Sequence, residues 1–178
     1  MKPRCPRCGV GPCLCDRIPR IETRTRFVIL RHVWELDKGS NTGRIAHLAL
    51  PNSVIHDIGV KDQPFDPTWI PDGSALLFPD PAKEVTEAPA TVVVLDGTWG
   101  QAKRMVHRNE ALWRLPRLRL DTPPARERLR TPPREEGMST IEAMAQVLAR
   151  YEDAEKGRQL DALYDVLWNA ISPWRAVP

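Results

Sequence analysis

The stretch that decides the fold is TVVVLDGTW, residues 91–99. Its first five residues are apolar or β-branched and predict a buried strand. Asp96 follows at the strand end, Gly97 permits a sharp turn, and Thr98 is a good first residue for a helix. A strand that passes through a short turn into a helix is the unit of a parallel α/β sheet, in which ligands bind beyond the carboxyl ends of the strands. The sequence therefore places the candidate site at Asp96.

The same alternation of strands and helices continues on both sides of this stretch. Proline-rich loops separate the elements, as at residues 61–73. The last helix carries an apolar stripe that should pack on the core, made of Leu160, Leu163, Leu167, Trp168 and Ile171. Further strands are expected at residues 26–33, 53–58, 75–78 and 115–120, and helices at 41–50, 98–109 and 139–151. The pattern predicts an α/β fold with a mostly parallel sheet and flanking helices.

All the cysteines of the chain lie close together near its start, at Cys5, Cys8, Cys13 and Cys15. The spacing C-x2-C-x4-C-x-C is typical of a knuckle that closes around a metal ion, and zinc accepts four thiolates in a structural site. An iron–sulfur cluster, a redox pair and a metal-free segment are the alternatives. We expect a zinc-binding segment at residues 1–22 and a catalytic domain at residues 23–178.

The composition is that of an ordinary globular protein, with 178 residues of which 42% are apolar and 28% are charged. No apolar run approaches the roughly 18 residues of a membrane helix, and no hydrophobic stretch follows the first residues. We therefore expect no membrane partner and a cytoplasmic location. In that compartment clustered cysteines bind metal more often than they form disulfides.

Positive charge gathers in two tracts of the chain. Residues 1–31 carry eight Lys or Arg against two acids, residues 101–134 carry ten against three, and residues 50–90 carry two against seven. Of the 26 basic residues, 20 are arginine, whose planar guanidinium suits phosphate and base stacking. The pattern favours a nucleic-acid surface, and a solvated surface without a partner is the alternative.

The residues after Asp96 suit an anionic or aromatic ligand. The helix start at Thr98 presents free backbone amides to an anion, and Trp99 offers a flat face to a base. Lys103 and Arg104 add positive charge alongside. The alternative is purely structural: Asp96 or Thr98 caps the helix, and Trp99 belongs to the core.

Five motifs follow one another along nearly the whole chain: CPRC…CLC, NTGR, LLFP, LDGTWGQAKRM and GMSTIEA. In this order they resemble the DTW-domain family. His32 and Glu35 lie where relatives have a His-Pro-x-Glu pattern, with Val33 in place of the proline. The resemblance implies a SPOUT-like fold, in which the C-terminal part of an α/β sheet is knotted, an exception to the rule that chains do not knot.

The resemblance also implies a reaction, that of a tRNA-uridine aminocarboxypropyltransferase. Such enzymes move the 3-amino-3-carboxypropyl group of S-adenosylmethionine to N3 of a uridine, which forms acp3U, and release methylthioadenosine. Uridine N3 lies on the Watson–Crick edge, so the base must be unpaired or flipped out to be reached. Asp96 is the candidate general base, because it stands at the strand end.

The expected donor site joins the strand-end turn to a second helix start. The amides of Ser139 and Thr140 suit the donor carboxylate and Glu142 suits its amino group, although Ser139 and Glu142 also match a capping box. The expected S-adenosylmethionine contacts are Phe78, Pro79, Asp96, Gly97, Thr98, Trp99, Leu118, Leu120, Ser139, Thr140, Glu142 and Ala143. The expected tRNA contacts are Arg44, Lys103, Arg104, Arg126, Arg128, Arg130 and Arg134, beside the zinc segment.

Other functions remain open at this point. A SPOUT-type methyltransferase would use the same donor and transfer its methyl group instead. The RNA substrate is either tRNA or ribosomal RNA. A zinc-knuckle RNA-binding protein without catalysis needs only the cysteines and arginines, and it leaves the DGTW turn without a role. The sequence is compatible with a monomer and with a homodimer.

Overall fold

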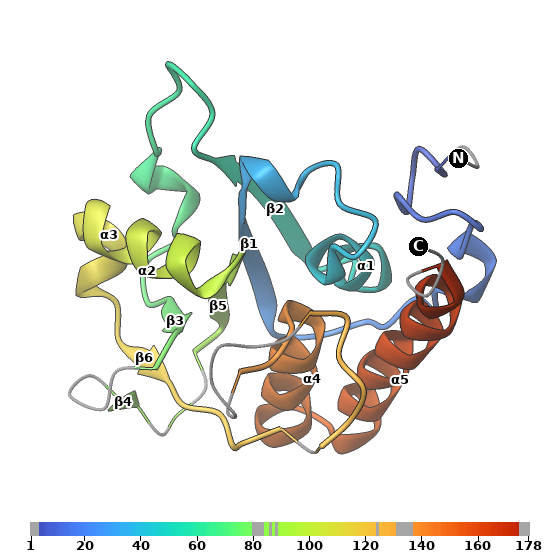
Figure 1. Ribbon diagram of the computed structural model, residues 1–178. Coiled ribbons are helices and arrows are strands. Elements are labelled where there is room, and N and C mark those ends of the chain that lie inside the picture. Colours follow the sequence, from blue (N-terminus) through green and yellow to red (C-terminus); the bar gives the residue numbers. More distant parts are fainter. Residues whose placement is uncertain are drawn as a thin grey trace.

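A parallel sheet forms the middle layer of the molecule, with helices on both of its faces (Figure 1). The computed structural model describes residues 4–79, 84–85, 87, 89–123, 125–130 and 137–174. Within this part of the chain the sheet has six strands in the order β2-β1-β5-β3-β6-β4, and every neighbouring pair is parallel. The strands are β1 (Arg26–His32), β2 (Ser53–Ile58), β3 (Ala75–Leu77), β4 (Glu84–Val85), β5 (Thr91–Asp96) and β6 (Arg117–Leu118).

The two most apolar strands, β1 and β5, lie side by side in the middle of the sheet. Strands buried on both faces read as continuous apolar runs rather than as an alternation, and both RFVILRH and TVVVLD have this form. Their register pairs Arg31 with Asp96, while Arg31 forms a bidentate ion pair with Asp57 of β2 at 2.7 and 3.1 Å. Polar side chains from three adjacent strands therefore meet at the carboxyl edge of the sheet.

Helices cover the two faces of the sheet unequally (Figure 1). On one face α2 (Trp99–Arg108) and α3 (Glu110–Arg114) pack on Val28, Leu30 and Val93 through Met105, Val106 and Leu112. The other face carries the larger cluster, built on α1 (Thr42–Ala49), α4 (Thr140–Tyr151) and α5 (Ala154–Ile171). The side chains alternate between these clusters along β1, because successive residues of a strand point to opposite faces.

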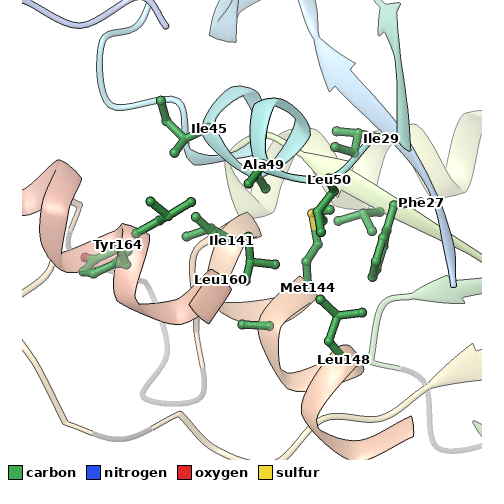
Figure 2. Packing of buried hydrophobic residues seen from close by; sticks show 14 of the residues in the cluster. Phe27, Ile29, Ile45, Ala49, Leu50, Ile141, Met144, Leu148, Leu160 and Tyr164 are labelled. Carbon is green, nitrogen blue, oxygen red and sulfur yellow. The ribbon is translucent and has the colours of Figure 1, made fainter. Parts of the chain in front are cut away.

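Figure 2 shows how the larger cluster is assembled. Phe27 and Ile29 of β1 meet Met144 of α4, and α1 and α5 close over them. The cluster residues labelled in the figure are Phe27, Ile29, Ile45, Ala49, Leu50, Ile141, Met144, Leu148, Leu160 and Tyr164, each at most 1% exposed. Each fully buried large apolar side chain stabilises the fold by about 1.5–3 kcal/mol relative to the exposed side chain. This face therefore supports α4, whose start forms part of the site.

The N-terminal cysteine segment packs on the same cluster. Val10, Leu14 and Ile21 are at most 3% exposed and belong to the core that α1, α4 and α5 share. A short 3-10 helix, Cys15–Arg17, completes the segment. Figure 1 shows the segment beside the end of α5. The segment is therefore joined to the α/β domain by apolar packing.

Most of the expected elements are present within one or two residues of their predicted ends. The strand expected at 115–120 is only Arg117–Leu118, because Pro116 has no N–H to donate to a ladder and the buried Arg117 side chain donates to the carbonyls of Leu112 and Leu115. The short elements α3 and β4 were not expected, since they are too short to show periodicity. A 3-10 helix, Pro67–Trp69, interrupts the proline-rich loop. Among the described residues, no helix has the length and apolar character of a membrane span.

Candidate functional site at the carboxyl edge of the sheet

A cavity of about 630 Å³ opens at the carboxyl edge of the sheet, a size common for sites that bind cofactor-sized ligands. Its walls come from the segments that follow β3, β5 and β6 and from the start of α4. All the residues expected to contact S-adenosylmethionine line it: Phe78, Pro79, Asp96, Gly97, Thr98, Trp99, Leu118, Leu120, Ser139, Thr140, Glu142 and Ala143. Segments that are far apart in the sequence thus line the same cavity.

Asp96 is the central polar group of this cavity. Its side chain is held by two donors from other segments: Thr140 Oγ1 donates to Oδ1 at 2.7 Å, and Asn41 Nδ2 donates to Oδ2 at 2.6 Å. The Asn41 amide cannot turn round, because its Oδ1 accepts the Arg44 N–H at 2.7 Å and caps α1. Asp96 is only 4% exposed. Its orientation is therefore set by the starts of α1 and α4.

Gly43 makes this arrangement possible. A Cβ on Gly43 would lie 2.6 Å from Asp96 Cγ and 2.7 Å from Oδ2, closer than carbon and oxygen atoms can approach. Only a glycine allows the start of α1 to come so close to the carboxylate. The NTGR motif thus has a structural explanation: Asn41 donates to Asp96, Gly43 gives it space, and Arg44 donates to the Leu36 carbonyl and lies against Gly9 of the cysteine segment.

Burial raises the pKa of Asp96 above its ordinary value, against the hydrogen bonds from Thr140 and Asn41, which favour the charged form. The negative charge of Glu35 raises it further. A carboxylate with a raised pKa is a better proton acceptor than an exposed aspartate. The physical chemistry of Asp96 therefore fits a general base.

Glu142 is a second buried carboxylate in the cavity wall, 2% exposed. Its Oε2 accepts the Ser139 N–H at 2.8 Å and the Ser139 hydroxyl at 2.7 Å, which completes the expected capping box of α4. Its Oε1 accepts from Arg128 at 2.5 Å and lies 3.3 Å from Arg126 Nε. Glu142 thus fixes both the start of α4 and the arginines of the 125–130 segment.

Glu35 is a third buried carboxylate, 1% exposed, on the 3-10 helix Val33–Glu35 that follows β1. It forms ion pairs with Lys38 and Arg130, each at 2.6 Å, and Arg130 also donates to the Ser40 hydroxyl at 3.1 Å. Burial opposes its charge, but the hydrogen bonds from Arg130 and Lys38 prevail and lower the pKa of Glu35. Glu35 therefore stays ionised beside Asp96.

The residues expected to contact tRNA fall into separate groups. Lys103 and Arg104 are exposed on α2. Arg126 pairs with Asp161 of α5, whereas Arg128 and Arg130 line the cavity and pair with its buried acids. Arg44, on α1, is half-buried, and Arg134 lies outside the described residues. Within the structure, Lys103 and Arg104 are thus the expected RNA contacts most open to solvent.

In the turn after Asp96, Thr98 has a structural role and Trp99 lines the cavity. Thr98 caps α2 in a capping box with Gln101, whose Oε1 accepts the Thr98 N–H at 2.7 Å. This is the helix-capping role that the sequence allowed for Thr98. Trp99 is half-buried, lines the cavity, and packs on Phe78 with ring centroids 5.8 Å apart. An aromatic wall therefore stands next to the carboxylate.

The four cysteines form a cluster suited to a tetrahedral metal ion. All four Sγ atoms lie within 4.8 Å of one another, and Cys5 and Cys15 are 3.7 Å apart. Four thiolates at the usual zinc–sulfur distance stand about 3.8 Å apart. Hydrogen bonds from nearby backbone N–H groups lower the pKa of Cys5 to about 6, whereas burial and the neighbouring thiols raise that of Cys15 to about 12. A dication would allow all four thiols to ionise together.

The fold and the cavity define the class: a parallel α/β protein with a cofactor-sized cavity at the carboxyl edge of its sheet, around buried carboxylates. The DTW domain matches residues 2–172, and the chain belongs to the DTW-domain family. The chain is similar to tRNA-uridine aminocarboxypropyltransferase 2 of Drosophila melanogaster, with 31% identity over 174 residues that cover 88% of this chain and 69% of the relative.

Proteins of the same name in two mammals are also similar. Those of Macaca fascicularis and Mus musculus are each 27% identical over an alignment of 171 residues, which covers 85% of this chain. The chain spans 57% of the length of each of these relatives. No solved structure gives a significant match.

Several residues of the site were not expected from the sequence. Asn41 and Gly43 were noted only as part of the NTGR motif, and Ser40 was assigned no role at the cavity. Glu35 was noted for its place in a motif and now lines the cavity, as does Tyr164 of α5. The NTGR motif and the His-x-x-Glu spacing were the sequence signals that could have indicated these residues. Neither signal shows that the residues lie near Asp96, because only the topology of the sheet brings them together.

Proposed function

We propose that this protein transfers the 3-amino-3-carboxypropyl group of S-adenosylmethionine to N3 of a uridine in tRNA. The observation that carries the proposal is Asp96, a buried carboxylate with a raised pKa, in a cofactor-sized cavity lined by every expected donor contact. The names of the relatives support the same reaction, since each is a tRNA-uridine aminocarboxypropyltransferase. The product would be acp3U.

The reaction requires a base and a placed donor. Asp96 takes the proton from uridine N3, and the N3 electron pair forms a bond to the γ-carbon of the aminocarboxypropyl group. The bond between that carbon and the sulfonium sulfur breaks, and its electron pair stays on sulfur in neutral methylthioadenosine. The positive charge of the donor and the negative charge of Asp96 are both lost, so the step balances in atoms and charge.

The cavity offers complementary groups for each part of the donor. Phe78 and Trp99 supply apolar faces for the adenine ring. Of the two amides expected to hold the donor carboxylate, that of Ser139 already donates to Glu142, so the Thr140 amide at the start of α4 is the one that suits it, because a helix N-terminus favours anions. Glu142 suits the ammonium group. A donor held at both ends of its amino-acid chain would direct the γ-carbon, rather than the methyl group, to the uridine.

For the RNA, we propose contacts from the two basic tracts. Lys103 and Arg104 offer exposed charge on α2, and Arg44, Arg126, Arg128, Arg130 and Arg134 complete the expected set. Contacts to phosphate position the RNA and weaken with salt. Residues 1–22 would form a structural zinc segment beside residues 23–178, the catalytic domain. The order of the motifs supports a SPOUT-like chain path with a C-terminal knot.

Mass spectrometry of nucleosides tests the proposal. Unmodified tRNA transcript is incubated with purified protein and S-adenosylmethionine, then digested. We expect a uridine heavier by one aminocarboxypropyl group, together with released methylthioadenosine. A methyl increment would mean a methyltransferase, and an adduct on ribosomal RNA but not on tRNA would change the substrate. Absence of donor binding by calorimetry would favour a non-catalytic RNA-binding protein.

A further inference from the structure

Trp34 is the most exposed large hydrophobic side chain among the described residues, at 70%. The only other exposed one in that part of the chain is Trp113, at 45%. Single apolar residues on a surface are common, so exposure alone indicates no function. A function for Trp34 must therefore be argued from its position and from the residues around it.

The turn that carries Trp34 is held firmly. The Trp34 N–H donates to His32 Nδ1 at 3.2 Å, and the Leu36 N–H donates to the Val33 carbonyl at 3.2 Å. The next side chain, Glu35, is buried and bound by Lys38 and Arg130. An exposed indole on a turn fixed at both sides loses little conformational entropy on binding a partner.

This turn also lies at the edge of the proposed active site. Glu35, the residue after Trp34, lines the cavity, whereas Trp34 itself is exposed outside the lining. On the other side, a Cβ on Gly97 would lie 3.5 Å from His32 Cβ, which places His32 directly against the turn after Asp96. The rings of His32 and Trp34 are 5.2 Å apart and tilted by 60°. An aromatic pair therefore stands beside the turn that carries Gly97, the residue after the proposed base.

Two cations, Arg104 and Lys38, lie near the pair, and Lys38 is itself paired with the buried Glu35. Burial and the charge of Arg104 lower the pKa of His32, the negative charge of Glu35 opposes this, and Lys38 lowers it further. An aromatic surface beside Lys and Arg side chains is the usual way to bind unpaired nucleotides, because bases stack on the ring and cations attract the phosphates. A peptide partner would gain less from this combination.

We infer that the Trp34 indole stacks on an unpaired nucleobase adjacent to the target uridine. The inference rests on the proposed function and adds a specific RNA contact to it. A uridine that enters the cavity with its N3 exposed leaves a gap in the RNA stack, and the base beside it loses a stacking partner. Trp34 replaces that partner. It is a positioning residue and takes no part in the transfer step.

Three variants of Trp34 test the role of stacking. Fluorescence anisotropy measures the dissociation constant of a labelled tRNA transcript, and calorimetry measures that of S-adenosylmethionine. We expect Trp34→Ala and Trp34→Leu to weaken tRNA binding by about 5- to 100-fold, the range for one lost stacked base, and Trp34→Phe to stay within about threefold of the wild type. The affinity for S-adenosylmethionine should not change.

Kinetics and salt dependence separate stacking from other effects. KM for tRNA should rise with the dissociation constant, while kcat at saturating tRNA stays within about twofold. The salt dependence of tRNA binding should keep the wild-type slope, because no phosphate contact is lost. Trp113→Ala is the matched control, since it removes the other exposed tryptophan, and it should bind tRNA as the wild type does.

The inference is wrong if Trp34→Ala keeps wild-type tRNA affinity, if Trp34→Leu does so, or if affinity for S-adenosylmethionine falls in parallel. It is also wrong if Trp113→Ala weakens tRNA binding as much as Trp34→Ala. Failure of the proposed reaction gives a different result. Binding of tRNA that depends on Trp34, without any adduct from the wild type, would support the stacking role and refute the transfer.

Discussion

The cysteine segment and the Asp96 cluster both bring polar side chains together, but over very different distances in the sequence. The cysteine thiols lie on one short stretch, from Cys5 to Cys15. Asp96 takes its two hydrogen-bond donors from 55 residues before it and 44 residues after it. A local cluster depends on its own spacing and on a metal ion, whereas a remote cluster depends on the whole fold. The two should therefore respond differently to the same kind of change.

Removal of the proposed zinc ion should have the largest effect, and it should affect the local cluster first. We expect chelation, or Cys8→Ser, to lower the free energy of unfolding by several kcal/mol, because structural zinc contributes on the order of 10 kcal/mol to small metal-bound folds. Loss of the segment would also expose Val10 and Leu14. Thermal unfolding with and without chelator, with zinc content measured by mass spectrometry, checks this. Equal stability of the two forms would contradict it.

Asp96→Asn should have a large effect on catalysis. We expect the rate of transfer to fall by about 10²- to 10⁴-fold, the usual contribution of a positioned base, with little change in the affinity for either substrate. Single-turnover assays at saturating tRNA measure this. Asp72→Asn, in the exposed turn before β3, is the control and should keep the wild-type rate. Full activity of Asp96→Asn with normal tRNA binding would exclude Asp96 as the base.

Gly43→Ala tests whether the remote cluster depends on close packing. Alanine is favoured over glycine in a helix by about 1 kcal/mol. A loss of stability in Gly43→Ala would therefore indicate a clash between the added methyl group and Asp96. We expect a loss of about 1–3 kcal/mol of stability, as for other overpacked sites, and a slower reaction.

Gly100→Ala is the matched control for Gly43→Ala. Gly100 occupies the same position in α2 that Gly43 occupies in α1, and a Cβ on Gly100 would meet only the flexible end of the Arg104 side chain, at 3.6 Å. This variant should be as stable as the wild type or slightly more so. Similar losses in both variants would mean that Gly43 acts through the helix backbone rather than through Asp96.

The smallest expected effect concerns Glu152, which binds residues distant in the sequence and lies away from the cavity. It accepts the N–H groups of Arg24 and Thr25 and pairs with Lys156. Burial opposes its charge, but these donors lower its pKa to about 2 from an ordinary 4.5. Glu152 therefore stabilises the fold above about pH 4.5, and this contribution is lost as the pH falls towards 2.

We expect Glu152→Gln to cost about 1–3 kcal/mol at pH 7, the usual contribution of hydrogen bonds to a charged group, and much less near pH 2. Denaturant unfolding across this range measures the difference. Asp96 should behave in the opposite way. Because burial raises its pKa above the ordinary 3.8, its ionisation destabilises the fold as the pH rises from 3.8 through the raised value, and Asp96→Asn should remove this dependence.

The contrast between local and remote clusters also explains what the sequence could predict. The strands β1, β2 and β5 and the helices α1, α2 and α4 follow from apolar patterns and caps such as Asn41, which are local signals. The residues that line the cavity could be predicted from the order of the family motifs. The short β4 and α3 leave no local pattern, and the strand expected at 115–120 was shortened by the tertiary contacts of Arg117.

The partners of the arginines could not be predicted either. In the sequence, Arg126, Arg128 and Arg130 belong to a basic tract, whereas in the fold each meets a carboxylate from another segment. Charge counted along the chain says nothing about pairing across the fold. The hydrogen bond from Asn41 to Asp96 is a further case, because a capping residue is recognised locally and its second partner lies on another strand.

The central position of β1 has a consequence for the newly made chain. Residues 26–58 contain β1, α1 and β2, a parallel unit that can form early, but the other edge of β1 pairs only with β5, which ends at residue 96. At a synthesis rate of about 5–20 residues per second, the 38 residues between 58 and 96 take about 2–8 s. During that time β1 presents an apolar, unpaired edge, the kind of edge to which other chains add. Each newly made chain is therefore prone to aggregation for a short time, until β5 is synthesised and pairs with β1.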